Sequence, residues 1–199
     1  MCISFYQIGV YGTKGVASVN NIPGARRGSS SWVDKAGNLW LHGGAGYDKN
    51  GSLGYLNDLW KYDIASNQWS WRGGSDAANQ VAIYGSLGIA ASSNIPGARQ
   101  YGTNWADSTT NTLWLYGGTG YIEDLAVGAL NDLWKYNMST NAWTWVSGSK
   151  AINQNGVYGT KGIAASSNIP GARYYAQAWL GENGKLLLFG GQGYDKNGQ

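Results

Sequence analysis

Aromatic and acidic side chains stand close together at three equivalent places in the 199-residue sequence. Each place follows a Gly-Gly stretch. Aromatic rings beside carboxylates suit the binding of a sugar or a peptide, because the rings offer apolar contact and the carboxylates accept hydrogen bonds. The competing interpretation is that these side chains pack the loops onto one another. The candidate ligand-binding residues of this group are Tyr47, Asp48, Tyr121, Glu123, Asp124, Tyr194 and Asp195.

Catalytic chemistry has few candidates, because the chain contains one histidine and one cysteine. His42 stands where equivalent phrases carry Tyr116 and Phe189, so we expect it to be a core residue. Cys2 lies in the N-terminal segment with no matching partner motif. The chain lacks the ligands of a conventional zinc site, and no nucleophile or carboxylate pair has a recognisable catalytic setting. We therefore assign no catalytic residue, no metal and no cofactor.

Two Asp-Lys-Asn-Gly stretches, at 48–51 and 195–198, resemble the beginning of a calcium-binding loop. The remaining ligands of such a loop, including its closing glutamate, are missing. Asn-Gly is a common tight-turn dipeptide, so we predict a turn at each stretch.

The composition excludes several classes of protein. The net charge of +3 is mild and the basic residues are scattered, which argues against nucleic-acid binding. No apolar run is long enough for membrane insertion. Thirty-two glycines and many aromatic residues favour short strands joined by turns, in an all-β fold.

The chain repeats itself at intervals of 73 and 74 residues, marked by its only three prolines. We name the three units the first, second and third copy, after Pro23, Pro96 and Pro170. The first two copies share five phrases in the same order, whereas the third copy contains only the first three of them. In the first copy these phrases are VYGTKG, NIPGAR, NLWLHGG, LNDLWKYD and NQWSWR; in the third copy only the first three are found.

Each complete copy predicts four antiparallel strands. The first strand runs from the arginine of PGAR to the tryptophan six residues later. The second, LWLHGG, is apolar on both faces and should be buried on both. The third is DLWKYD, and the fourth, QWSWR, alternates like a half-exposed outer strand. Because the second strand needs cover on both sides, we expect neighbouring copies to stack around an axis as a β-propeller.

The loops that join strand four to strand one and strand two to strand three should lie on the same face of such a disc. They are also the long loops, at 45–56, 73–98, 119–130 and 147–172, and they carry the aromatic and acidic residues named above. The predicted division of the chain is a loop segment at 1–25, a first module at 26–72, a loop at 73–98, a second module at 99–146, a loop at 147–172 and half a module at 173–199.

The proline phrase is interpreted as the start of each module. Proline restrains the preceding isoleucine to extended geometry, glycine permits a sharp turn, and arginine begins the first strand. Arg26, Arg99 and Arg173 should therefore surround one mouth of the axis. They are predicted either to form ion pairs between modules or to contact an anion or glycan. Asp58 and Asp132 recur with the module and are interpreted as structural.

This pattern resembles the kelch repeat. A strand that ends in Gly-Gly, a Tyr-containing strand and a Trp-bearing strand carry the match, at Gly43-Gly44, Tyr62 and Trp69 in the first copy. The second copy repeats them, and the third matches only through its Gly-Gly. The resemblance implies kelch-type propeller blades of four antiparallel strands. The period exceeds the roughly 50 residues of a usual kelch unit, and the longer inter-blade loops are similar to those of a bacterial subgroup.

The number of copies gives about two and a half blades, an incomplete arc. The expected partners are the remaining blades of a larger propeller, or other copies of the chain associating through exposed blade faces. The resemblance also implies an extracytoplasmic location, for which the sequence carries no targeting signal.

Three functions remain open. The first is a non-enzymatic module that offers its long loops to a protein or a glycan. The second, implied by the resemblance to galactose oxidase, is part of an enzyme whose catalytic residues lie outside this sequence. The third is a structural spacer within a large surface protein. We prefer the first, because no catalytic constellation is present.

Overall fold

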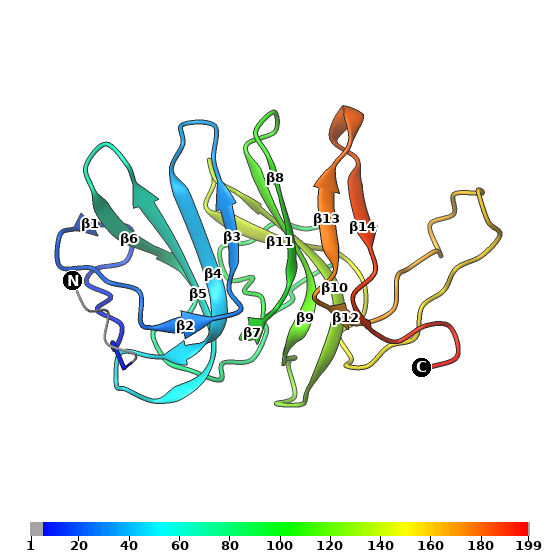
Figure 1. Ribbon diagram of the computed structural model, residues 1–199, viewed down its shortest axis with the longest axis horizontal. Coiled ribbons are helices and arrows are strands. Elements are labelled where there is room, and N and C mark those ends of the chain that lie inside the picture. Colours follow the sequence, from blue (N-terminus) through cyan, green and yellow to red (C-terminus); the bar gives the residue numbers. More distant parts are fainter. Residues whose placement is uncertain (1–5, 199) are drawn as a thin grey trace.

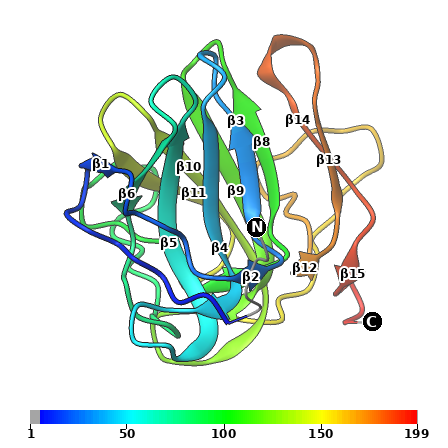
Figure 2. The same ribbon diagram turned by 60° about the vertical axis from the view of Figure 1, so that its left-hand side comes forward.

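The computed structural model describes residues 6–198 as antiparallel β-sheets, with no α-helix among those residues. Figure 1 shows three groups of strands side by side, one for each sequence copy, and Figure 2 shows the same groups turned by 60°. The predicted all-β class is confirmed. Cys2 lies outside the described residues.

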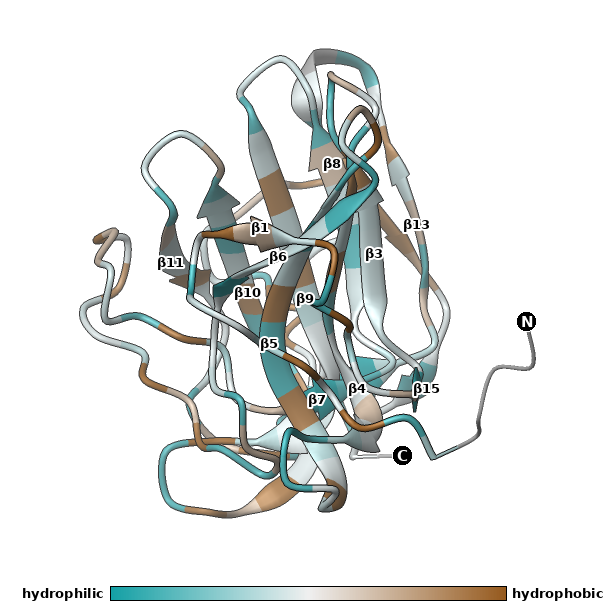
Figure 3. Cartoon of the chain, turned by 90° about the vertical axis from the view of Figure 1, so that its left-hand side faces the viewer, coloured by the Kyte–Doolittle hydropathy of each residue, from teal (hydrophilic) through white to brown (hydrophobic). Residues whose placement is uncertain are grey.

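The first copy forms one sheet in the order β1-β6-β5-β4-β2, with β3 also paired to β4. Its strands are β1 (Ala17–Ser18), β2 (Arg26–Arg27), β3 (Ser30–Val33), β4 (Leu39–Tyr47), β5 (Leu53–Asp63) and β6 (Gln68–Gly73). Side chains alternate between buried and exposed along β3, as the two faces of a strand require. Figure 3 shows bands of hydrophobic and hydrophilic residues along β5.

The second copy repeats this sheet in the order β11-β10-β9-β7, with β8 paired to β9. The third copy contributes two separate strand pairs, β12 with β15 and β13 with β14. These strands are β7 (Arg99–Gln100), β8 (Thr103–Asp107), β9 (Thr112–Tyr121), β10 (Val127–Asn137), β11 (Ala142–Ser147), β12 (Arg173–Tyr174), β13 (Gln177–Leu180), β14 (Leu186–Phe189) and β15 (Gln192–Gly193), with a 3₁₀ turn at Glu182–Gly184.

The predicted first strand of each copy is in fact two strands with a break between them. Gly28, Tyr101 and Tyr175 occupy the break and have φ values of +67°, +57° and +59°. This left-handed backbone interrupts the strand. Tyrosine rarely adopts a positive φ. The residue type at this position in the second and third copies therefore does not indicate the break.

The predicted long loops at 45–56 and 119–130 are wrong, because the strands continue through most of them. β4 runs on to Tyr47 and β5 begins at Leu53, and β9 and β10 behave in the same way. Gly43 and Gly44, with φ of +64° and +99°, shift the register of the β4–β5 ladder without ending it.

The main core lies between the first two sheets. Trp32, Trp40 and Leu59 of the first sheet pack against a set of side chains from the second sheet and its preceding loop. That set is Ala82, Tyr84, Leu113, Leu115, Trp134, Tyr136 and Trp143. Burying several tryptophans in one layer supplies most of the apolar contact that holds the sheets together.

Indole groups also join each sheet to the next by hydrogen bonds. The Trp32 Nε1–H donates to the Trp114 carbonyl at 3.1 Å. The Trp105 Nε1–H donates to the Leu187 carbonyl at the same distance. Equivalent tryptophans thus connect the first copy to the second and the second to the third.

The prediction that the second strand is buried on both faces holds only in the second copy. Leu113, Leu115 and Tyr116 are all buried there. In the first copy Leu39 is 40% exposed, and in the third Phe189 is 72% exposed. The difference follows from position, since only the middle sheet has a neighbour on each face.

The proline phrase starts β2, β7 and β12 as predicted. The isoleucine before each proline makes a β-bridge to a valine or isoleucine upstream. The role predicted for its glycine is wrong, because Gly97 has no positive φ. A Cβ at Gly97 would lie 1.9 Å from the Tyr121 carbonyl oxygen, so glycine is needed for close approach of two backbones.

No helix among the described residues is both long and apolar enough to cross a bilayer.

Candidate functional site

Asp48, the first predicted carboxylate, is held by backbone hydrogen bonds in the turn after β4. Asp48 is buried and accepts hydrogen bonds from the backbone N–H groups of Asn50, Ser52 and Ala78, at 2.8–3.1 Å. Burial alone would raise the pKa of Asp48, but these backbone bonds outweigh it and lower that pKa. Asp48 therefore closes its turn and ties down the loop that leaves β6. The turn predicted at 48–51 is confirmed.

The equivalent acidic residues of the other copies make similar bonds. Glu123 accepts from the Tyr84 backbone N–H at 3.3 Å and forms an ion pair with Lys150 at 3.4 Å. The Asp124 carboxylate accepts from a backbone N–H within its own turn, and so does Asp195. These carboxylates mainly organise the loops that carry them.

The predicted tyrosines lie at the same end of the sheets. Tyr47 and Tyr121 end β4 and β9, and Tyr194 follows β15. The ring of Tyr121 contacts that of Tyr55 at 6.1 Å between centroids, which links the first two copies. The structure thus places the predicted tyrosines and carboxylates at equivalent turns of three copies, without gathering them around one cavity.

Two of the predicted arginines form buried ion pairs. Arg99 donates to both oxygens of Asp132, at 2.7 and 2.8 Å, and its side chain is 1% exposed. Arg26 pairs in the same way with Asp58, at 2.5 and 2.7 Å. Each pair lies within one sheet, so the interpretation as ion pairs between modules is wrong.

A tyrosine and a tryptophan complete each of these ion pairs. In the second copy, Tyr84 Oη–H and Trp134 Nε1–H donate to Asp132 Oδ2, at 2.9 and 2.8 Å. In the first copy the donors are Tyr11 and Trp60, both at 2.7 Å. Burial, together with the Asp132 charge, raises the pKa of Tyr84 above its ordinary range. The tyrosine therefore stays a hydrogen-bond donor.

Arg173 differs from the other two arginines. It is only partly buried, and among residues 6–198 it has no carboxylate partner. Its Nη2 group donates to the Tyr158 hydroxyl at 3.3 Å.

His42 is a core residue, as predicted. It is 1% exposed and its ring lies 5.6 Å from that of Trp143 in the second sheet. Among the described residues neither ring nitrogen has a hydrogen-bond partner. Burial, followed by the charge of Arg99, lowers the pKa of His42 to about 3.

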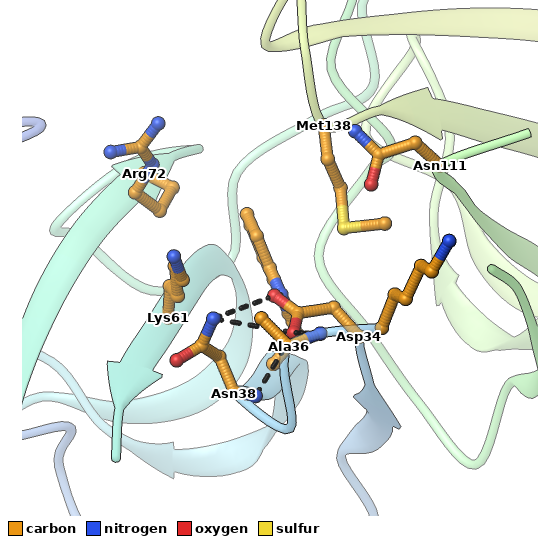
Figure 4. Close-up of a pocket in the computed structure, with 9 residues that line it drawn as sticks. Asp34, Ala36, Asn38, Lys61, Arg72, Asn111 and Met138 are labelled. Carbon is orange, nitrogen blue, oxygen red and sulfur yellow. Dashed lines mark hydrogen bonds between the residues drawn. The ribbon is translucent and has the colours of Figure 1, made fainter. Parts of the chain in front are cut away.

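A groove that the sequence did not predict lies between the first two sheets, at the opposite end from the Asp48 turn. Its volume is about 400 Å³. Figure 4 shows Lys61 and Arg72 on one side, Asn111 and Met138 on the other, and the turn after β3 between them. The full lining is Asp34, Lys35, Ala36, Asn38, Trp40, Lys61, Arg72, Asn111 and Met138.

The groove is rich in positive charge. Its single carboxylate, Asp34, accepts hydrogen bonds from Asn38 and from the Trp40 indole, shown as dashed lines in Figure 4 where both partners are drawn. Burial would raise the pKa of Asp34, but these bonds lower it. Within the described residues Lys35, Lys61 and Arg72 form no ion pair.

Arg72 has hydrogen-bonding capacity to spare. Its Nη2 donates to the Asn141 side-chain oxygen at 2.6 Å. Its Nε is buried and has no partner in the part of the chain that the structure describes. A buried donor without an acceptor is costly, so an anion reaching Arg72 would gain a strong charge-assisted bond.

Two of the cations that line the groove occur in the first copy and not in the second, which offers a signal that sequence reasoning could have used. Ser108 and Val146 of the second copy replace Lys35 and Arg72, whereas Lys61 has a counterpart in Lys135. Residues common to all copies serve the scaffold. Departures confined to one copy point to a specific site.

No protein-family model matches the chain. No curated protein matches it either. Among residues 6–198, no three His, Cys, Asp or Glu residues come together as a metal site would require.

Proposed function

We propose that the three copies are β-propeller blades of the kelch type and that the chain is a non-enzymatic module that binds an acidic glycan. The repeated phrases and the stacking of one antiparallel sheet per copy support the architecture. The ligand surface is the groove of Asp34, Lys61 and Arg72, and not the loop end, where the predicted carboxylates already bond to backbone.

One observation carries this proposal: three cations that form no ion pair among the described residues surround a hollow of about 400 Å³, and the single carboxylate of its lining is already hydrogen-bonded. That volume falls within the roughly 300–1,000 Å³ of small-ligand sites. Arg72 offers the planar fork that suits a carboxylate or a sulfate. Asn111 is a polar side chain on the facing wall, suited to sugar hydroxyl groups. A uronic acid presents both kinds of group.

The test is titration calorimetry with tri-galacturonate and, as the neutral counterpart, maltotriose. The acidic sugar should bind, and raising the salt concentration should weaken it because screening acts on charge pairs. The variant K35S/R72V gives the first groove the residues of the second copy. We expect it to lower the affinity at least about tenfold, since each charge-assisted bond contributes about 1.5–3 kcal/mol.

The matched control is K49M, which removes an exposed lysine at the other end of the sheets and should leave the affinity unchanged. Circular dichroism and thermal unfolding establish that both variants are folded. Equal binding of the two sugars would refute the proposal. Full binding by K35S/R72V would refute it as well.

A further inference from the structure

The breaks in the first strands of the three copies form a row. The residue at the break is Gly28 in the first copy, Tyr101 in the second and Tyr175 in the third. The Tyr101 N–H donates to the Gly28 carbonyl at 2.6 Å, and the Tyr175 N–H donates to the Tyr101 carbonyl at 3.3 Å. Backbone hydrogen bonds therefore hold equivalent residues of consecutive copies against one another.

The two tyrosines of this row adopt a backbone conformation that suits glycine. A bulky residue at positive φ is an outlier, and such strained residues concentrate at functional sites. Gly28 shows that the break itself needs no side chain. What Tyr101 and Tyr175 add to the row is therefore their phenol rings.

The rings of Tyr101 and Tyr175 stack on each other. Their centroids are 4.2 Å apart and their planes make an angle of 35°. The next shortest separation of two aromatic rings among the described residues is 4.9 Å. A hydrogen bond with the Tyr101 side chain raises the pKa of Tyr175, so this phenol is neutral at pH 7. Stacked rings with bonded hydroxyl groups bring the carbons ortho to the two hydroxyls close together.

A small molecule can reach this pair. Tyr101 and Tyr175 both line a hollow of about 270 Å³. The other described residues of its lining are glycine, serine, alanine and glutamine, which a one-electron oxidant does not attack readily. Oxidation within the hollow therefore falls on the two tyrosines.

We propose that Tyr101 and Tyr175 form a modification site, at which a one-electron oxidant joins the second copy to the third by a dityrosine bond. Each phenol loses one electron and one proton and becomes a tyrosyl radical. The two radicals combine through one ortho carbon each, and the hydrogens of these carbons move to the oxygens, which restores both phenols. One carbon–carbon bond forms, two equivalents of the oxidant take up two electrons, and water takes up two protons. The site is separate from the glycan groove.

Other tyrosine pairs lack this geometry. Tyr55 and Tyr121 also connect two copies, but their centroids are 6.1 Å apart and their planes make an angle of 73°. Tyr174 meets Tyr175 edge-on at 5.4 Å. An edge-on ring does not lay its ortho carbons beside those of its partner, so we expect coupling at Tyr101 and Tyr175 alone.

The whole chain is oxidised with photo-excited tris-bipyridyl ruthenium and a limiting amount of persulfate, and is then digested with trypsin. Cleavage after arginine and lysine places Tyr101 in the peptide 100–135 and Tyr175 in the peptide 174–185. We expect to recover these two peptides joined, with the loss of two hydrogen atoms. Fragmentation should locate the bond at Tyr101 and Tyr175, and the intact chain should remain a monomer on a denaturing gel.

Conservative variants identify the partners. Y101F and Y175F keep the rings but remove one hydroxyl each, and each should abolish the joined peptide. The matched control is Y121F, which alters the other tyrosine pair between copies and should leave the yield unchanged. Circular dichroism establishes that all three variants are folded.

A second measurement reads the bond through stability. The joined chain should unfold at a higher urea concentration than the untreated chain, because the bond closes a long loop and lowers the conformational entropy of the unfolded state. Y101F carried through the same oxidation should show no such increase, which separates the bond from other oxidative changes.

Three results would overturn the proposal. The first is the absence of the joined peptide from the folded chain when other tyrosine or tryptophan residues have been oxidised. The second is a joined peptide of undiminished yield in Y101F or Y175F. The third is an equal yield from the chain oxidised in urea, since the bond would then not depend on the fold.

Discussion

His42 is the only histidine of the chain. Replacing it by phenylalanine should therefore change how the free energy of unfolding depends on pH, which tests the packing of this ring between the first two sheets. The nearby charged groups belong to the two buried ion pairs, Arg26–Asp58 and Arg99–Asp132. Because burial lowers the pKa of His42 to about 3, the folded chain keeps the ring neutral at pH 5. The unfolded chain protonates it with a pKa of about 6.5.

The direction of the pH effect on stability follows from the number of protons that the folded and unfolded chains bind. Stability due to this group is fully present above about pH 6.5 and falls as the pH drops toward the folded pKa near 3, because only the unfolded chain takes up the proton. Between pH 7 and pH 5 the free energy of unfolding should fall by about 2 kcal/mol. Carboxylates contribute little in that window, since their ordinary pKa values lie near 4.

The substitution H42F removes this dependence. Phe189 already stands at the equivalent position of the third copy, so the ring should fit, and two ring nitrogens without partners among the described residues are removed. H42F should be as stable as the original chain at pH 7 or more stable, by about 1 kcal/mol. Its unfolding free energy should then hardly change down to pH 5.

The assay is urea unfolding followed by tryptophan fluorescence, with linear extrapolation at each pH. Two results would refute the reasoning. One is a constant unfolding free energy of the original chain between pH 7 and pH 5. The other is an undiminished fall in H42F, which would assign the proton uptake to another group.

Two further substitutions test the scaffold by the same urea method. Asp132→Asn leaves Arg99 buried without a countercharge and should lower the free energy of unfolding by about 3–5 kcal/mol; a loss below about 1 kcal/mol would contradict the assigned role of the pair. Gly97→Ala forces a Cβ to within 1.9 Å of the Tyr121 carbonyl oxygen and should cost about 2–3 kcal/mol. Gly73→Ala, where the nearest heavy atom is at 3.8 Å, is its control and should be nearly neutral; equal losses would argue against backbone crowding at Gly97.

Much of the scaffold could be predicted because equivalent residues of the three copies could be compared. Comparing His42 with Tyr116 and Phe189 identified a core position, and the Asp48 stretch was recognised as a turn. The strands and their antiparallel order followed from alternation and repeated turn residues. Equivalent positions in the copies show which residue types one structural environment accepts, which a single residue does not.

The rest depended on three-dimensional relations that spacing does not encode. Glycine usually signals the end of a strand, yet Gly43 and Gly44 only shift the register of the β4–β5 ladder. β4 therefore extends beyond its predicted end. The groove could not be found from local pattern, because Lys35 lies in the turn after β3 and Arg72 lies in β6, and they line one groove only after the sheet folds. Tyr101 at positive φ carries no signature in its residue type.

The ion pairs within a copy and the indole hydrogen bonds between copies have different consequences for how the repeat can be extended. The ion pair of Arg99 and Asp132 joins side chains of one copy, so a duplicated gene segment delivers both partners together. The bond from Trp32 to the next copy ends on a backbone carbonyl, which a neighbour of any sequence supplies. New copies could therefore be added by unequal crossing-over without waiting for matched substitutions, and each could then diverge in its other residues, as the difference between Arg72 and Val146 illustrates.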